Sequence, residues 1–291
     1  MSGHFQSPAQ LQMLIRRHAF TLKKSLGQNF LVDGNILGKI VDAADLHAES
    51  LVLEIGPGAG ALTRLLAERA AKVAAIEIDQ RLKPLLAETL SGCDNVSVCF
   101  ADVLAVDLEQ FLSAEFPGEQ AITVVANLPY YVTTPILMKL LSASNRLAKI
   151  VVMVQKEVAE RLEAHPGTKS YGSLSIAVQY QAVPDIVMTV PKTVFIPQPN
   201  VDSAVLRVTM RQQKQVQPRD EHFFFKLVRA SFTQRRKTLV NNLTHNLFTK
   251  EQRADIVRTL ERVGISPERR GETLSIAEFA DLSDALLEML D

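Results

Sequence analysis

Short apolar runs alternate with helical patterns through the first half of this 291-residue chain, and this alternation constrains the fold most strongly. Each run has about the length of one strand and is almost entirely apolar, which is typical of strands buried on both faces of a parallel sheet. The runs lie at 51–55, 72–77, 96–100, 121–126 and 149–155, with helical patterns at 61–70, 81–90 and 134–144. We therefore predict an α/β fold with an open, mostly parallel, Rossmann-like sheet.

The second half of the chain departs from this alternation. Two further strands are predicted at 185–190 and 201–208, and the link between them is too short for a crossover helix, so the last strand is expected to be antiparallel. From residue 218 onward only helical patterns occur. We expect three parts, an N-terminal basic arm over 1–22, the sheet domain over 23–210, and a small all-helical C-terminal domain over 218–291.

Basic residues are unevenly distributed, although the formal net charge is zero. Residues 192–245 hold ten Lys or Arg against three Asp or Glu, and residues 1–30 hold four basic residues and no acid. This distribution is typical of a surface that binds a polyanion. From charge alone, an ordinary solvated surface is an equally good interpretation.

The chain carries no signature of a metal site or a membrane segment. Its two cysteines, Cys93 and Cys99, have no histidines at zinc-ligand spacing, so we expect buried, reduced thiols. No apolar run has the length of a membrane span, and the N-terminus has no hydrophobic signal core. We expect a cytoplasmic protein with no metal and no membrane partner.

A glycine-rich turn from Glu54 to Gly60 follows the first strand and opens a helix. Glycines let a ligand approach the backbone closely, and the start of a helix offers free N–H groups. Glu77 ends the next strand and Asp102 follows the third, where carboxylates can accept ribose hydroxyls and an adenine amino group. One such acid alone is better read as a helix cap or surface charge. Two of them beside the turn favour a nucleotide-like cofactor, and the G-x-G-x-G spacing argues modestly against a dinucleotide.

The fourth strand leads into the motif Asn127-Leu128-Pro129-Tyr130. This motif resembles the signature of enzymes that methylate the planar amines of bases. Further stretches match at 24–31 (KSLGQNFL), 195–203 (FIPQPNVDS) and 231–239 (SFTQRRKTL). From about Lys23 to its C-terminus the chain resembles the ribosomal RNA adenine dimethyltransferase family, and within it the bacterial enzymes that act on the small subunit.

The resemblance implies a class I methyltransferase that uses S-adenosylmethionine. An adenine amine is a poor nucleophile, because its lone pair is delocalised into the ring. The Asn127 side-chain oxygen and the Leu128 carbonyl would accept hydrogen bonds from its two N–H groups and so free the lone pair. Pro129 would hold the Leu128 carbonyl in place, because a proline restricts its own backbone and that of the residue before it. Tyr130 and Phe195 would stack on the two faces of the base. The implied cofactor contacts are Gln28, Asn29, Leu31, Gly56, Gly58, Glu77, Asp102 and Asn127.

The resemblance also implies a partner, 16S rRNA in the assembling small ribosomal subunit. The substrate would be two adjacent adenosines in a 3′-terminal hairpin, each dimethylated at N6 by a monomeric enzyme. Residues 23–210 would then be the catalytic domain and residues 218–291 an RNA-binding domain, using Arg229, Arg235, Arg236 and Lys237 for phosphate contacts. Residues 1–22 lie outside the resemblance, and we expect a disordered arm that orders on RNA.

Three alternatives stay open at this point. The first is a relative that methylates large-subunit rRNA and confers antibiotic resistance, although such relatives more often carry another residue where this chain has Leu128. The second is a non-catalytic ribosome-assembly factor on the same fold, which the intact motif after the fourth strand disfavours. The third is an NAD-dependent oxidoreductase, which leaves that motif without an explanation.

Overall fold

The computed structural model describes residues 13–14, 17–18, 20, 29–31, 33–143 and 145–290. The chain divides into two compact units, one formed by residues 1–159 and 185–210 and the other by residues 160–184 and 211–291. Within the described residues, no helix has the length and apolar character needed to cross a membrane.

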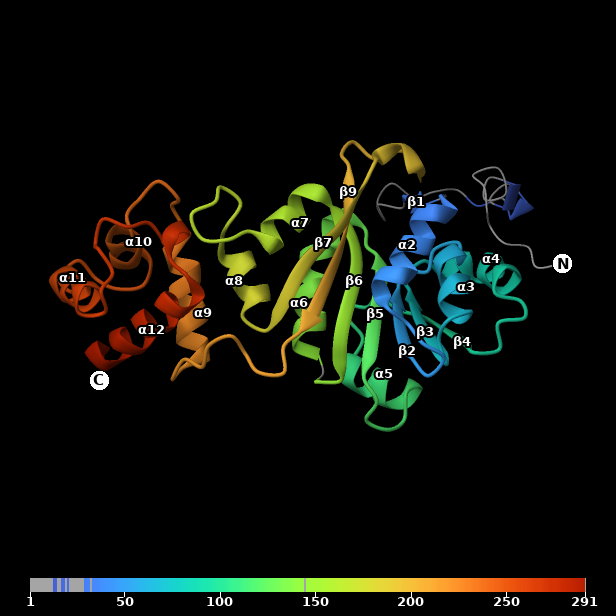
Figure 1. The fold of residues 1–291 in the computed structure, drawn as a ribbon, viewed down its shortest axis with the longest axis horizontal. Coiled ribbons are helices and arrows are strands. Elements are labelled where there is room, and N and C mark those ends of the chain that lie inside the picture. Colours follow the sequence, from blue (N-terminus) through green and yellow to red (C-terminus); the bar gives the residue numbers. More distant parts are fainter. Residues whose placement is uncertain are drawn as a thin grey trace. The chain divides into compact units, whose positions relative to one another are not determined.

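A seven-stranded sheet organises the first unit. Its strands are β2 (Leu51–Ile55), β3 (Lys72–Glu77), β4 (Val96–Phe100), β5 (Ile122–Asn127), β6 (Leu147–Gln155), β7 (Ala182–Val190) and β9 (Ser203–Met210). They lie in the order β4-β3-β2-β5-β6-β9-β7 (Figure 1), with β2 to β6 parallel and β9 antiparallel to β6. The predicted mostly parallel sheet with an antiparallel final part is confirmed. Every residue of β2 is buried, which explains why all its side chains except that of Glu54 are apolar.

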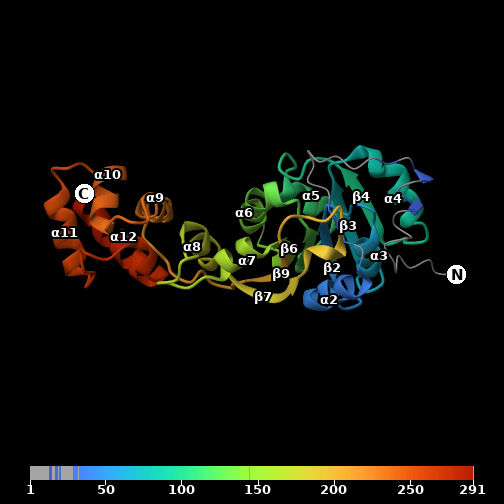
Figure 2. The same ribbon diagram turned by 90° about the horizontal axis from the view of Figure 1, so that it is seen from above.

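Helices cover both faces of this sheet (Figure 2). They are α2 (Gly34–Ala44), α3 (Ala61–Ala67), α4 (Lys83–Thr89), α5 (Leu108–Glu115) and α6 (Thr133–Ala143), with short 3₁₀ helices η2 (Gln80–Leu82), η3 (Tyr130–Val132) and η4 (Lys192–Val194). Leu37 of α2 and Leu66 of α3 belong to one buried cluster with Val52 and Val125 of the sheet. The crossovers therefore leave the carboxyl ends of β2, β3, β4 and β5 together at one edge.

A second, two-stranded sheet joins β1 (Phe30–Leu31) to β8 (Phe195–Ile196). The strands are antiparallel, with Phe30 opposite Ile196 and Leu31 opposite Phe195. This pairing holds the segment before α2 against the loop that precedes β9, although the two are far apart in sequence.

The second unit is helical. Its helices are α8 (Ser173–Gln179), α9 (Glu221–Ser231), α10 (Leu239–Asn246), α11 (Arg253–Arg262), η5 (Gly271–Thr273) and α12 (Ile276–Leu290), and α7 (Lys156–Glu163) ends within it. The structure differs from the expected division at residues 160–184, which we had placed in the sheet domain. Tyr171, Ile176 and Tyr180 are buried in the same cluster as Phe224 of α9, so this insertion completes the core of the helical unit.

Candidate active site

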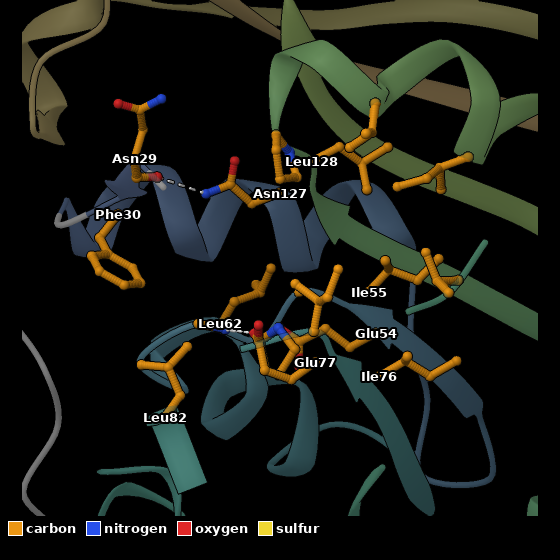
Figure 3. Close-up of a pocket in the computed structure, with 18 of the residues that line it drawn as sticks. Asn29, Phe30, Glu54, Ile55, Leu62, Ile76, Glu77, Leu82, Asn127 and Leu128 are labelled. Atoms are coloured by element: carbon orange, nitrogen blue, oxygen red, sulfur yellow. Dashed lines mark hydrogen bonds between the residues drawn. The ribbon is translucent and has the colours of Figure 1, made fainter. Parts of the chain in front are cut away.

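A cavity opens at the carboxyl ends of the parallel strands, between the turn after β2 and the segment after β5 (Figure 3). Ligands of open α/β sheets bind at this edge. The cavity collects the expected cofactor residues Asn29, Leu31, Gly56, Gly58, Glu77, Asp102 and Asn127, together with Leu128, Pro129 and Tyr130. Gln28 lies outside the described residues. All the described residues in this set come from the first unit.

The glycine turn forms one wall of the cavity. Gly56 and Gly58 have φ values of 72° and 55°, in the left-handed region that glycine adopts without strain. A Cβ atom on Gly58 would lie 2.8 Å from the ring of Phe30. Glycine at this position therefore lets Phe30 rest on the turn and keeps the backbone open to a ligand.

Glu77 is held by the backbone around it. Its Oε2 accepts a hydrogen bond from Gly58 N at 3.1 Å, and its Oε1 accepts one from Asp79 N at 2.8 Å. Burial raises the pKa of Glu77, and these two backbone hydrogen bonds oppose that shift because they favour the carboxylate. Each oxygen keeps a lone pair for a further donor such as a ribose hydroxyl.

Asp102 is an exposed carboxylate at the rim of the same cavity. Its Oδ1 accepts a hydrogen bond from Leu104 N at 2.8 Å, which fixes the side chain against the loop after β4. Apolar side chains of Ile55, Ile76 and Ile78 line the space beside it. A carboxylate pair, a glycine cradle and an apolar wall together fit a nucleoside group.

Asn127 points into the cavity from the end of β5, opposite Glu77 (Figure 3). Its Nδ2 donates to the backbone carbonyl of Asn29 at 3.3 Å, which sets the orientation of the amide. Among the described residues, none donates to Asn127 Oδ1 or to the Leu128 carbonyl. Two acceptors on consecutive residues therefore stay available to a ligand that carries two N–H bonds.

The two residues after this pair hold its geometry. Pro129 has φ −59° and ψ 132°, and its carbonyl accepts a hydrogen bond from the Thr133 hydroxyl at 3.2 Å. The Tyr130 hydroxyl hydrogen-bonds to Ser203 Oγ at 2.7 Å, and burial raises its pKa. The ring of Tyr130 is thus tethered to β9 at its hydroxyl end while it lines the cavity.

Phe195 lies away from the cavity. Its side chain is 3% exposed and packs in the core cluster with Leu37 and Val205, and it is not among the residues that line the cavity. The resemblance had suggested that Phe195 stacks on a base. Its pairing with Leu31 across β1 and β8 instead directs its ring into the core, so the position gives that role no support.

Glu54 also lines the cavity, and the sequence analysis gave it no role. It is 1% exposed, and its Oε2 has no hydrogen-bond partner among the described residues. Burial raises the pKa of Glu54 to about 8, and the nearby charge of Glu77 adds to the shift. An acid inside an apolar strand, directly before the glycine turn, was the signal that could have identified it.

The basic residues expected to contact RNA lie in the helical unit and differ in their surroundings. Arg235 donates to the Lys169 carbonyl at 2.6 Å and pairs with Glu272 at 3.1 Å. Arg229, Arg236 and Lys237 are exposed. Arg235 is exposed as well, but its charge is paired inside its unit, whereas among the described residues the other three have no ion pair.

The N-terminal residues that the structure describes are not a free arm. Leu14 is 3% exposed, and Arg17 and His18 each bind Glu88 of α4 at 2.7 Å. Most of the arm expected over 1–22 lies outside the described residues, so that expectation stays a prediction, and among the described ones Arg17 already has an acidic partner on its own chain.

Three comparisons relate the chain to known proteins. A family model described as "Ribosomal RNA adenine dimethylase" matches residues 19–286. The protein named Ribosomal RNA small subunit methyltransferase A from Geobacillus thermodenitrificans (strain NG80-2) is 58% identical over 290 residues, covering 99% of each chain. The protein of the same name from Bacillus mycoides (strain KBAB4) is 56% identical and covers 97% of each chain.

Solved structures give the same picture for the fold. A dimethyladenosine transferase from Plasmodium falciparum has a TM-score of 0.72 at 28% identity, over 89% of this chain and 96% of the other. The 23S rRNA methyltransferase ErmE has a TM-score of 0.67 at 28% identity, over 89% of this chain and 99% of the other.

Proposed function

The chain belongs to the ribosomal RNA adenine dimethylase family, and from that membership we propose that it dimethylates N6 of two adjacent adenosines in a 3′-terminal hairpin of 16S rRNA. It is an S-adenosylmethionine-dependent methyltransferase that acts on ribosomal RNA. The proposed substrate is the assembling small ribosomal subunit, and the proposed form is a cytoplasmic monomer. The observation that carries the choice of subunit is 56–58% identity, over essentially the whole chain, to relatives named for the small subunit.

The large-subunit alternative has weaker support. ErmE, whose name refers to 23S rRNA, shares 28% identity with this chain. The non-catalytic alternative is disfavoured because the acceptor pair at Asn127 and Leu128 is intact and directed at the cavity. The nicotinamide alternative gives no reason for two adjacent acceptors at this place.

The cavity walls would hold the cofactor from two sides. Glu77 would accept the ribose hydroxyls, and Asp102 would accept the adenine amino group of the cofactor. The open backbone at Gly56 and Gly58 allows close approach, and Asn29 and Leu31 from β1 line the same space. When bound, S-adenosylmethionine supplies a methyl group on a sulfonium, which is an electrophile toward an amine nitrogen.

The acceptor pair would prepare the target amine. Asn127 Oδ1 and the Leu128 carbonyl accept hydrogen bonds from the two N–H groups of the amine. These hydrogen bonds draw the nitrogen toward a tetrahedral shape, which localises its lone pair. Pro129 holds the Leu128 carbonyl, because the residue before a proline has a restricted backbone. No strong base is required, since the nitrogen becomes acidic once it is alkylated. Positioning of this kind supplies up to roughly 7–11 kcal/mol of the barrier.

The same pair would serve both transfers. A monomethylated amine keeps one N–H bond, and either acceptor remains able to take it. Tyr130 would stack on the target base, with its ring fixed through Ser203. Stacking on an aromatic ring contributes about 1–3 kcal/mol per base, which helps to offset the few kcal/mol that unstacking the base requires.

The helical unit would position the RNA. Arg229, Arg236 and Lys237 are exposed and suited to phosphate contacts, which orient a substrate without reading its sequence. Arg235 contributes indirectly, through the fold of its unit. Binding through such contacts weakens as salt rises.

The test is transfer of labelled methyl groups to small ribosomal subunits that lack adenine dimethylation, with large subunits as the comparison. The proposal predicts N6,N6-dimethyladenosine in small subunits alone, and none with the Asn127→Ala variant. Methylation of large subunits alone would move the protein to the alternative substrate. Cofactor binding without methylation of either subunit would contradict the enzymatic proposal.

A further inference from the structure

Two buried carboxylates, Glu54 and Glu77, line the cavity where the ribose is proposed to bind, and a third, Asp79, lies behind Glu77. Glu54, Glu77 and Asp79 are 1%, 4% and 5% exposed, respectively. The charges of Asp79 and Glu77 act on each other, and the charge of Asp79 helps to raise the pKa of Glu77. A carboxylate that has to remain a charged acceptor here needs a compensating cation nearby.

Arg81 supplies that cation. Its Nε donates to Asp79 Oδ1 at 2.8 Å and its Nη2 to Asp79 Oδ2 at 2.6 Å, a two-point contact that fixes the carboxylate in one plane. The backbone N–H of Asp79 in turn donates to Glu77 Oε1 at 2.8 Å. The guanidinium is therefore linked to the proposed ribose acceptor, Glu77, through Asp79, whose carboxylate it both orients and neutralises.

Phe20, in the N-terminal part of the chain, covers this arrangement. The Arg81 guanidinium carbon lies 4.9 Å from the centre of the Phe20 ring. On its other side Phe20 contacts Phe30, with ring centres 6.4 Å apart, and Phe30 rests on the turn at Gly58. Figure 3 shows Phe30 and Leu82 at the same end of the cavity as Glu77.

The N-terminal residues are anchored independently of this contact. Leu14 is buried in a cluster with Ala59, Leu82 and Phe30, all of which line the cavity. Arg17 and His18 hold Glu88 of α4. The described N-terminal residues thus contact η2, whose Leu82 lines the cavity, and α4, and Arg17 is already paired.

We propose that Phe20 and Arg81 are positioning residues for Glu77, so that the described N-terminal residues, Phe20 among them, serve affinity for S-adenosylmethionine. The inference rests on the proposed function, because it concerns the residue that would hold the ribose of the cofactor. Phe20 stacks on the guanidinium, Arg81 holds the Asp79 carboxylate, and the Asp79 backbone N–H holds Glu77 in place.

The experiment measures the Kd of S-adenosylmethionine and of S-adenosylhomocysteine by titration calorimetry on the full chain. Arg81→Gln should weaken both by about tenfold or more, the change that follows loss of one charge-assisted hydrogen-bond system. Phe20→Leu should weaken both by about threefold, and Arg81→Lys should recover part of the loss. In steady state the effect should fall on KM for the cofactor, with KM for the ribosomal subunit unchanged.

Arg207→Gln is the matched control. Arg207 pairs with Asp185 at 2.6 Å and its side chain is 40% exposed, against 2.6 Å and 37% for Arg81, but it lies on β9 and its partner makes no contact with Glu77. Its substitution should leave both Kd values unchanged. Unchanged Kd values in folded Arg81→Gln and Phe20→Leu would overturn the inference, as would a rise confined to KM for the subunit. Absence of binding by the unaltered protein would overturn the proposed function itself.

Discussion

The two sides of the cavity differ in how their hydrogen-bond acceptors are satisfied. On the Glu77 side, both carboxylate oxygens already accept backbone N–H bonds from Gly58 and Asp79. On the Asn127 side, no described residue donates to Asn127 Oδ1 or to the Leu128 carbonyl. The wall proposed for the cofactor is thus built in advance, and the wall proposed for the target amine keeps acceptors for the substrate to complete.

The difference follows from chemistry. A cofactor site has to bind the same molecule in every turnover, and acceptors fixed beforehand reduce the ordering that binding requires. A site that activates an amine has to offer acceptors that become best satisfied as the nitrogen changes shape, because only such interactions lower the barrier. Substitutions on the two sides should therefore affect different kinetic constants.

The largest expected effect is on the substrate side. Asn127→Ala removes one acceptor of the pair, and kcat on small ribosomal subunits should fall by roughly 10²–10³-fold, as for other preorganised polar groups at a reacting centre. Tyr131→Ala is the control, since Tyr131 lines the same cavity and has no assigned role. A fall in kcat that is equal for the two variants would contradict the assignment.

On the cofactor side, Glu77→Gln should weaken cofactor binding and spare the chemical step. The amide keeps the size of the side chain but loses the charge and presents N–H groups toward Gly58 N or Asp79 N. The Kd of S-adenosylhomocysteine, measured by calorimetry, should rise by about 10- to 100-fold. An unchanged Kd would remove Glu77 from the site.

Glu54 should make stability depend on pH. Its pKa is raised from 4.5 to about 8 in the folded chain, so between these values the folded state binds more protons than the unfolded state. The free energy of unfolding should therefore decline as the pH rises from 4.5 through 8. Glu54→Gln cannot ionise, and its Tm relative to the unaltered protein should improve by more than about 4 °C between pH 5 and pH 8. Parallel Tm curves would contradict burial of this acid.

The smallest effects are expected in the helical unit. Arg236→Ala should weaken binding to the ribosomal subunit a few-fold and reduce the slope of log affinity against log salt by about one. Arg235→Ala should instead lower Tm, because it removes the contacts with the Lys169 carbonyl and Glu272. Equal salt slopes for the two variants would show that the distinction drawn between them is wrong.

Much of the first unit follows from sequence pattern, because strands inside a parallel sheet that is covered on both faces are mostly apolar. The strands expected at 51–55, 72–77 and 96–100 have those bounds in the structure. Glu77 and Asn127 converge for a topological reason, since the carboxyl ends of parallel strands meet at one edge of a sheet. Their roles in binding and catalysis remain proposals.

The remaining features depend on contacts between residues distant in sequence. No local sequence pattern indicates that Tyr171 and Tyr180 are buried in the core of the helical unit, or that Arg235 forms an ion pair with Glu272. The burial of Phe195 follows from the pairing of β1 with β8, and no periodicity in the sequence predicts that pairing. Such features are decided by tertiary packing and lie beyond propensity and spacing.

On this account, Glu77 serves cofactor binding and Asn127 serves the chemical step. This difference is tested most directly by single-turnover methyl transfer to undermethylated small subunits, with the cofactor at a saturating concentration for each variant. The account predicts that Glu77→Gln then transfers methyl groups at a rate near that of the unaltered protein, whereas Asn127→Ala remains slower by roughly 10²–10³-fold. A saturated Glu77→Gln variant as slow as Asn127→Ala, or an Asn127→Ala variant restored by saturation, would contradict it.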